Sequence, residues 1–124
     1  MDKYDTNAFL VRFRVSNPSG TPCTIGIWSC TYFFQWGTDN TNVYVLGWGS
    51  HFNVVGGMTL NSTNVYSQEL PIVVRPNVKP GKLSFRMCFV PVKREDCDFP
   101  ENQPGGNWAE GKYWSDEITI TVAP

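Results

Sequence analysis

The feature that most constrains the fold is an alternation of apolar and polar residues with a period of two. In residues 9–15 (FLVRFRV) every odd position is apolar and two of the even positions are arginines. Residues 117–122 alternate in the same way, with Ile118, Ile120 and Val122 on one side. A period of two sends successive side chains to opposite faces of an extended chain, so each segment is predicted to be a strand with one buried face.

Blocks of turn-forming residues separate the alternating segments, and no segment shows the 3.6-residue period of an amphipathic helix. Residues 17–22 (NPSGTP), 37–42 (GTDNTN) and 77–81 (NVKPG) are such blocks. About eight short strands, with a turn every ten residues or so, are typical of an antiparallel sandwich. We therefore expect residues 1–124 to form a single all-β domain, an antiparallel immunoglobulin-like β-sandwich of about 7–9 strands.

Residues 24–36 (TIGIWSCTYFFQW) are the most aromatic stretch, and they could form either a binding platform or part of the core. One strand from Cys23 to Trp36 would run about 46 Å at about 3.3 Å per residue, well beyond a usual strand. We therefore expect a break near Ser29 and Cys30, with a bulge that exchanges the inward face. The core interpretation is favoured, with four inward rings: Trp28, Tyr32, Phe34 and Trp36.

The four cysteines, Cys23, Cys30, Cys88 and Cys97, allow three disulfide pairings. In residues 83–90 (LSFRMCFV) the apolar residues Leu83, Phe85, Met87 and Phe89 alternate with Ser84, Arg86, Cys88 and Val90. Cys88 is therefore expected to point outward, which argues against a bridge to Cys23 like the one that joins the sheets of antibody domains. A local bridge between Cys88 and Cys97 and unpaired buried thiols both remain open.

Several classes of function are disfavoured by what the chain lacks. The chain has a single histidine, His51, and no phosphate-binding glycine loop, so we expect no enzyme activity, no bound metal and no cofactor. The net charge is −1 and no basic stripe occurs, so we expect neither nucleic-acid binding nor attachment to anionic membranes. No apolar stretch reaches the roughly 20 residues that span a bilayer.

The long connection over residues 93–112, with the strand that follows it, holds the candidate site residues. Its first half contains four carboxylates, Glu95, Asp96, Asp98 and Glu101, whose oxygens could bind calcium, although their spacing does not follow the twelve-residue calcium loop between two helices. Asp96 and Asp98 are kept as candidate partner-binding residues. In the second half, Trp108, Tyr113 and Trp114 could stack on a sugar or anchor a protein, and Trp108 could equally fold back onto the domain.

Four segments together resemble a known group: RFRVSNPSGTP, IWSCTYFFQW, PGKLSFRMCFVPV and YWSDEITITV. Their order resembles that of a group of uncharacterised bacterial immunoglobulin-like domains, which implies a β-sandwich and leaves the activity open. The opening strand and the Asn-Pro turn are more loosely similar to the small β-sandwich intracellular proteinase inhibitors. No inhibitory residue can be carried over from that group.

The function expected from these observations is a non-catalytic interaction module that binds a protein, or a glycan, through its end loops. Two alternatives stay open, namely a proteinase inhibitor that uses residues 93–112 and a carbohydrate-binding module. The sequence leaves the oligomeric state open. Low charge and an acceptor triplet for glycosylation, Asn61-Ser62-Thr63, favour an extracellular or periplasmic location over a cytoplasmic one.

Overall fold

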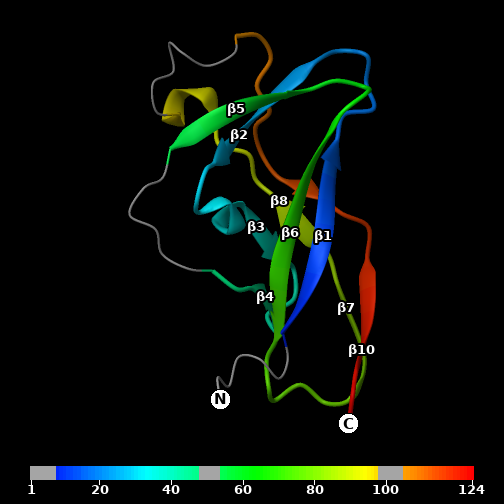
Figure 1. The fold of residues 1–124 in the computed structure, drawn as a ribbon. Coiled ribbons are helices and arrows are strands. Elements are labelled where there is room, and N and C mark those ends of the chain that lie inside the picture. The colour runs from blue at the N-terminus through cyan, green and yellow to red at the C-terminus, as the bar shows by residue number, and fades with distance from the viewer. Residues whose placement is uncertain (1–7, 48–53, 98–104) are drawn as a thin grey trace.

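The computed structural model describes residues 8–47, 54–97 and 105–124, and it is all-β in these ranges (Figure 1). Every ladder between two strands is antiparallel. No described segment is an α-helix, and the two short helices are of the 3-10 type, η2 (Tyr32–Gln35) and η3 (Arg94–Asp96). The strands are β1 (Ala8–Ser16), β2 (Cys23–Trp28), β3 (Trp36–Thr38), β4 (Val43–Val45), β5 (Val55–Leu60), β6 (Val65–Val74), β7 (Gly81–Phe85), β8 (Met87–Phe89), β9 (Tyr113–Trp114) and β10 (Ile118–Val122). The expectation of an antiparallel all-β fold is confirmed for this part of the chain.

The first half of the fold is one long antiparallel ribbon with a bend. β1 pairs with β6 from Ala8 opposite Val73 onward, and β2 pairs with β5, with Cys23 opposite Leu60. The chain runs from β1 into β2 on one side and from β5 into β6 on the other, and the ribbon turns at these two connections (Figure 1). Asn17 stabilises the bend, because its side-chain amide donates hydrogen bonds to the carbonyls of Thr21 (2.8 Å) and Leu60 (3.0 Å).

A second ribbon is built from β7 and β8 on one side and β9 and β10 on the other. It is interrupted at Arg86, where the Met87 N–H donates to the Ser115 hydroxyl (2.9 Å) and the Ser115 N–H donates to the Met87 carbonyl (2.8 Å). β3 pairs with the other edge of β8, which gives the order β3-β8-β9. The predicted continuous strand over residues 83–90 is therefore two strands.

Residues 36–45 join the two ribbons. β3 lies in the second ribbon, whereas β4 pairs with β6 in the first, which gives the order β1-β6-β4. The Phe13 ring of β1 contacts the Trp36 ring of β3, with centroids 5.4 Å apart, and Trp36 contacts Phe89 of the neighbouring strand β8 at 4.9 Å. The hydrophobic core takes buried side chains from all four sheets, such as Ile25, Leu70, Phe85 and Phe89.

The predicted inward faces of the first and last strands are confirmed. Along β1 the even positions from Leu10 to Ser16 are exposed, while Phe9, Val11, Phe13 and Val15 are partly buried against the core. Ile118 and Ile120 of β10 also pack against it. The alternation fails at Cys88, which was expected to point outward but is buried. β8 lies between two strands, and its partner β9 places Trp114 directly opposite Cys88.

The aromatic stretch breaks where it was expected to, but a bulge is the wrong explanation. β2 ends at Trp28 and the chain then forms η2, so a two-residue alternation no longer applies. Phe33 and Gln35 of this helix are buried, whereas Phe34 is 72% exposed and Tyr32 is half-buried. Trp36 is buried as expected and Trp28 is half-buried. The prediction that Phe34 belongs to the core is therefore wrong.

Proline is usually confined to edge strands, because it has no N–H to donate to a ladder. Pro71 nevertheless lies in β6, the central strand of its sheet. Its carbonyl accepts a hydrogen bond from the Leu46 N–H, one residue beyond the end of β4. Because the N and C=O of one strand residue point to the same side, the proline nitrogen faces the place where the β4 ladder ends. The missing donor thus removes no bond from a strand ladder.

Tyr66 provides a test of the core at high pH. Its hydroxyl donates to Gln68 Oε1 (3.1 Å) and its ring lies 5.9 Å from that of Phe89. Burial raises the pKa of Tyr66 to about 12, because the ionised phenolate loses its hydration. The folded state then keeps a proton that the unfolded chain releases above pH 10, so stability is expected to fall between about pH 10 and pH 12. Urea denaturation of wild type and Tyr66→Phe across this range is the measurement, and equal pH slopes for the two proteins would contradict it.

The four cysteines all lie within the described residues and form no disulfide, so neither bridge considered from the sequence is present. Cys88 and Cys97 are buried, and Cys23 and Cys30 are half-buried. Burial raises the pKa of the Cys88 thiol, which lowers its reactive thiolate fraction. Cys88 is therefore expected to react with a thiol reagent at neutral pH at least tenfold more slowly than Cys30, as measured by mass spectrometry of labelled peptides. In urea the two rates should converge, and equal rates in the native protein would show that the site opens readily.

Candidate binding groove between two sheet edges

Tyr113 and Trp114 form β9, the short edge strand next to β8. Each side chain is 49% exposed, although both are large and aromatic. Gly111, with a φ of 91°, supplies a left-handed backbone conformation just before this strand. On the side away from β8, no strand of the described residues pairs with β9.

Two adjoining hollows, of about 220 and 120 Å³, lie between β9 and the C-terminal end of β1. The larger lies beside Phe13 and Arg14 and extends to Trp114 and Ser115, and the smaller extends beyond Asn17. The residues that line both hollows are Val15, Ser16, Phe89 and Tyr113. The hollows thus lie next to each other, and we call them together the edge groove.

The edge groove has apolar walls and a few polar groups. Its apolar lining includes Phe13, Val15 and Phe89, and Arg14 and Ser16 are exposed on the β1 side. The Ser115 hydroxyl is already occupied, since it accepts from the Met87 N–H and donates to the Asp116 carbonyl (2.8 Å). The described residues that line the groove are largely apolar, and they include the half-buried thiol of Cys23.

Trp108, the third aromatic candidate, packs onto the first ribbon. Trp108 forms an isolated β-bridge with Thr24. The Thr24 N–H donates to the Asn107 carbonyl (2.7 Å), and the Ala109 N–H donates to the Thr24 carbonyl (2.8 Å). The indole covers Gly57 so closely that an added Cβ there would lie 2.8 Å from the ring. Of the two roles left open by the sequence, the structure places Trp108 in the folded-back one.

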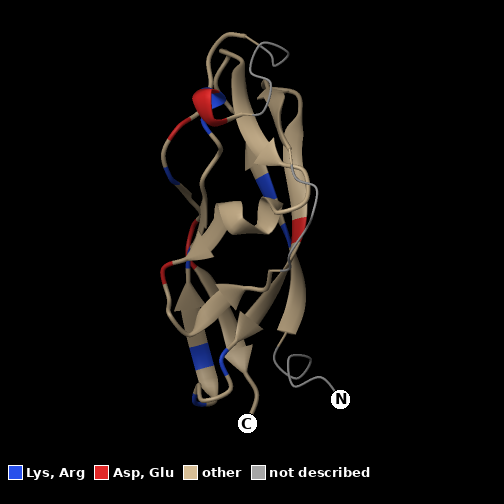
Figure 2. Ribbon diagram, turned by 90° about the vertical axis from the view of Figure 1, so that its left-hand side faces the viewer, with Lys and Arg blue, Asp and Glu red and all other residues tan. Residues whose placement is uncertain are grey.

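The acidic candidates are only partly described. Asp96 is exposed in η3, where its N–H donates to the Lys93 carbonyl (3.0 Å). Asp98 and Glu101 lie outside the described residues, as does His51. Within residues 8–47, 54–97 and 105–124, no group of three or more His, Cys, Asp or Glu side chains is placed to hold a metal ion. Positively and negatively charged residues are scattered over the described part of the fold (Figure 2). No helix in that part is long and apolar enough to cross a membrane.

A second, more open hollow of about 390 Å³ lies on the first ribbon. It is lined by Trp28 and Tyr32 from the aromatic stretch, by Gln68, and by the backbone at Gly56 and Gly57. The stretch that was expected to supply core rings therefore also contributes half-buried rings to the surface.

Sequence reasoning identified the β9 side of the edge groove and missed the β1 side. The alternation showed that Arg12 and Arg14 face solvent, but it carries no information on whether β1 has one neighbour or two. No protein-family model matches the chain, and no curated protein and no solved structure matches it significantly. The resemblance to bacterial immunoglobulin-like domains therefore rests on the four sequence segments alone.

Proposed function

We propose that this protein is a non-catalytic interaction module with an immunoglobulin-like β-sandwich fold, and that it binds a protein partner through the edge groove. The antiparallel ribbons and the contact of the Phe13 and Trp36 rings between two three-stranded sheets are compatible with that fold. The largely apolar lining that the described residues give the groove favours binding over chemistry.

The observation that carries this proposal is an edge strand of two half-exposed aromatic residues that borders an apolar hollow. Single exposed apolar residues are common on protein surfaces and need no explanation. Tyr113 and Trp114 are adjacent, each 49% exposed, and both border the edge groove. Tyrosine and tryptophan are the residues that most often dominate the free energy of protein interfaces, since they bury a large area at a low cost in side-chain entropy.

The two alternatives have weaker support from the described residues. Part of the connection that an inhibitor would insert into a protease, residues 98–104, lies outside them. A carbohydrate-binding module would use the open hollow at Trp28 and Tyr32, where aromatic faces lie beside the Gln68 amide.

The test is selection of a displayed random-peptide library on the immobilised protein, followed by binding measurements on the selected peptides. Peptides are expected to bind the wild type and to lose at least tenfold in affinity when Tyr113 and Trp114 are both replaced by alanine. Phe34→Ala is the matched control, because Phe34 is also an exposed ring but does not line the groove. It should leave the affinity unchanged.

Failure to select any peptide, or equal binding by the double variant, would overturn the proposal. A glycan array and a panel of proteases, run on the same protein, cover the alternatives. A glycan that quenches the tryptophan fluorescence of the wild type but not of Trp28→Ala would replace the proposal with a carbohydrate-binding function. Inhibition of a protease without cleavage of the protein would replace it with the inhibitor.

A further inference from the structure

Among the described residues, β1 is an edge strand of its sheet. It pairs with β6 over all nine of its residues, and no described strand pairs with its other side. The bond from the Leu46 N–H to the Pro71 carbonyl shows that the odd-numbered residues of β6 direct their backbone groups toward β4. The even-numbered residues of β6 therefore bond the odd-numbered residues of β1. It follows that the N–H and C=O groups of five β1 residues point away from β6: Ala8, Leu10, Arg12, Arg14 and Ser16.

Little in β1 prevents another strand from adding to this edge. The strand contains no proline, and its register with β6 runs without a bulge from Ala8 to Ser16. Natural edge strands are commonly blocked by such features, or by charged side chains. Here the blocking features are the two exposed arginines, Arg12 and Arg14.

The edge groove fits the side chains that an added strand would bring. A strand paired with the C-terminal half of β1 would direct every second side chain to the core-facing side of the sheet, next to Phe13 and Val15. Such side chains are about 7 Å apart along a strand. The two hollows lie in sequence beside Phe13–Ser16 and Val15–Asn17, so neighbouring inward side chains would enter one hollow each, with Tyr113 bordering both.

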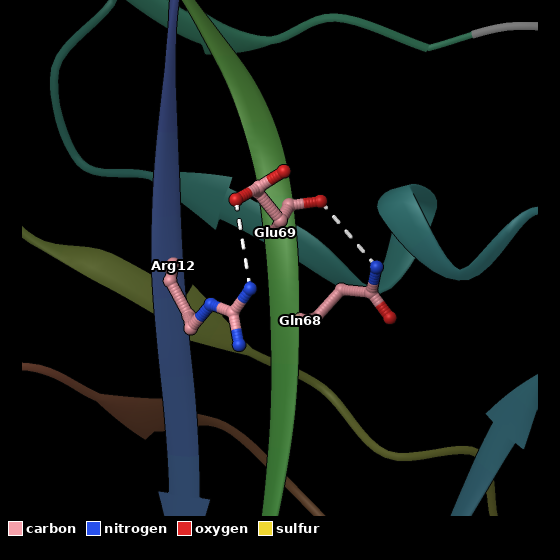
Figure 3. Close-up of polar contacts among 3 residues, drawn as sticks. All are labelled: Arg12, Gln68 and Glu69. Carbon is pink, nitrogen blue, oxygen red and sulfur yellow. Dashed lines mark hydrogen bonds and ion pairs between the residues drawn. The ribbon is translucent and has the colours of Figure 1, made fainter.

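The outer face of β1 is positive. Arg12 forms an ion pair with Glu69 of β6, with 3.7 Å between Nη2 and Oε2 and both side chains at least half exposed (Figure 3). Arg14 lies opposite Ser67 and makes no ion pair within the described residues. Side chains directly opposite on adjacent strands are about 5 Å apart, where opposite charges stabilise the pairing and like charges destabilise it.

The same charges disfavour a second copy of this chain as the added strand. An antiparallel pair of β1 strands centred on Arg12 would place Arg12 opposite Arg12, and a shift of one rung would place Arg12 opposite Arg14. A partner with acidic residues on its outer face avoids this repulsion.

We propose that the edge groove binds an extended segment of a partner protein, which adds to β1 as a further strand. The segment has apolar residues at alternate positions, which enter the groove, and acidic residues between them, which face Arg12 and Arg14. The proposal rests on the proposed function and specifies its partner. Backbone hydrogen bonds supply affinity in this mode of recognition, while the alternate side chains supply selectivity.

Four synthetic peptides test the proposal by titration against the intact protein. The first is a nine-residue capped peptide in which glutamate alternates with valine or isoleucine. The second has lysine in place of glutamate, the third has the first composition in scrambled order, and the fourth is N-methylated at alternate amides. The first peptide is expected to bind at least tenfold more tightly than each of the others.

Charge reversal and hydrogen exchange locate the binding. Arg14→Glu is expected to reverse the preference between the glutamate and lysine peptides, whereas Lys79→Glu, in an exposed turn, changes the net charge equally and should not. The amides of Arg12, Arg14 and Ser16 should exchange more slowly when the first peptide is bound. The amides of Val11 and Phe13 already face β6 and should change little.

Equal binding of the glutamate and lysine peptides, or unchanged exchange at Arg12 and Arg14, would overturn strand addition. If library peptides still required Tyr113 and Trp114 in that case, the interaction function would stand and only the binding mode would be wrong. Protection of the same β1 amides by raising the protein concentration alone, with a doubled mass in light scattering, would assign the edge to a second copy and also overturn the proposal.

Discussion

Replacing Gln35 with leucine is expected to lower the free energy of unfolding by about 3 kcal/mol, because it leaves buried backbone groups without partners. Gln35 is 5% exposed in η2. Its Oε1 accepts from the Trp28 N–H (2.9 Å), and its Nε2 donates to the carbonyls of Gly26 (2.9 Å) and Val90 (3.0 Å). One side chain thus provides hydrogen-bond partners for backbone groups of β2 and of the segment after β8, at the point where the two ribbons meet.

Urea denaturation followed by tryptophan fluorescence measures this effect. Gln68→Leu is the matched control, because the Gln68 amide is half-buried and makes longer contacts of 3.1 and 3.4 Å. That variant should lose less than about 1 kcal/mol. Gln35→Glu should also be strongly destabilised, since it keeps the acceptor for the Trp28 N–H but places a carboxylate beside two carbonyls. A Gln35→Leu variant as stable as the control would show that the hydrogen bonds of Gln35 contribute little to stability.

The second large effect is expected from Gly26→Ala, at about 2–3 kcal/mol. A Cβ on Gly26 would lie 2.3 Å from the Val92 carbonyl oxygen, well inside any real contact between these atoms. Gly26 and Val92 form an isolated antiparallel bridge, with the Val92 N–H donating to the Gly26 carbonyl (3.0 Å). The methyl group would push residues 90–93 away from β2 and weaken that bond.

Gly56→Ala is a close control for this prediction, because Gly56 lies in β5, opposite Ile27, and a Cβ there would meet nothing within 4 Å. It should change stability by less than about 1 kcal/mol, with a gain from the reduced entropy of the unfolded chain. Equal losses in the two alanine variants would mean that backbone entropy, rather than the close approach of Val92, sets the effect. Gly26 and Gln35 share one carbonyl, so the double variant should lose less than the sum of the single losses.

The sequence predicted those strands whose burial differs between their two faces. β1 and β10 have one face toward the core and one toward solvent, and their alternation could be read directly. β8 could not be read in this way, because Met87, Cys88 and Phe89 are all buried between two neighbouring strands. The same limit explains η2, where local alternation predicted an inward Phe34 although the chain turns there.

The contacts that build the fold and the candidate site depend on residues far apart in the chain. The Gln35 amide reaches the Val90 carbonyl across 55 positions, and the exposed edge of β1 follows from which strand pairs with β6. Neither relation leaves a local pattern in composition or periodicity. Tyr113 and Trp114 were predicted as binding residues from their type and their place after a long connection, and the structure adds their half-exposed setting beside β1.

The pairing of β1 with β6 has a consequence for how the chain is made. Ala8 meets Val73, and Cys23 meets Leu60, so the first two strands leave the ribosome well before their partners exist. Until then the apolar side of β1 and the rings around η2 have no sheet to cover them. Such long-range topology slows folding and exposes the nascent chain to aggregation. The protein should therefore gain more from a chaperone than a helical protein of equal length.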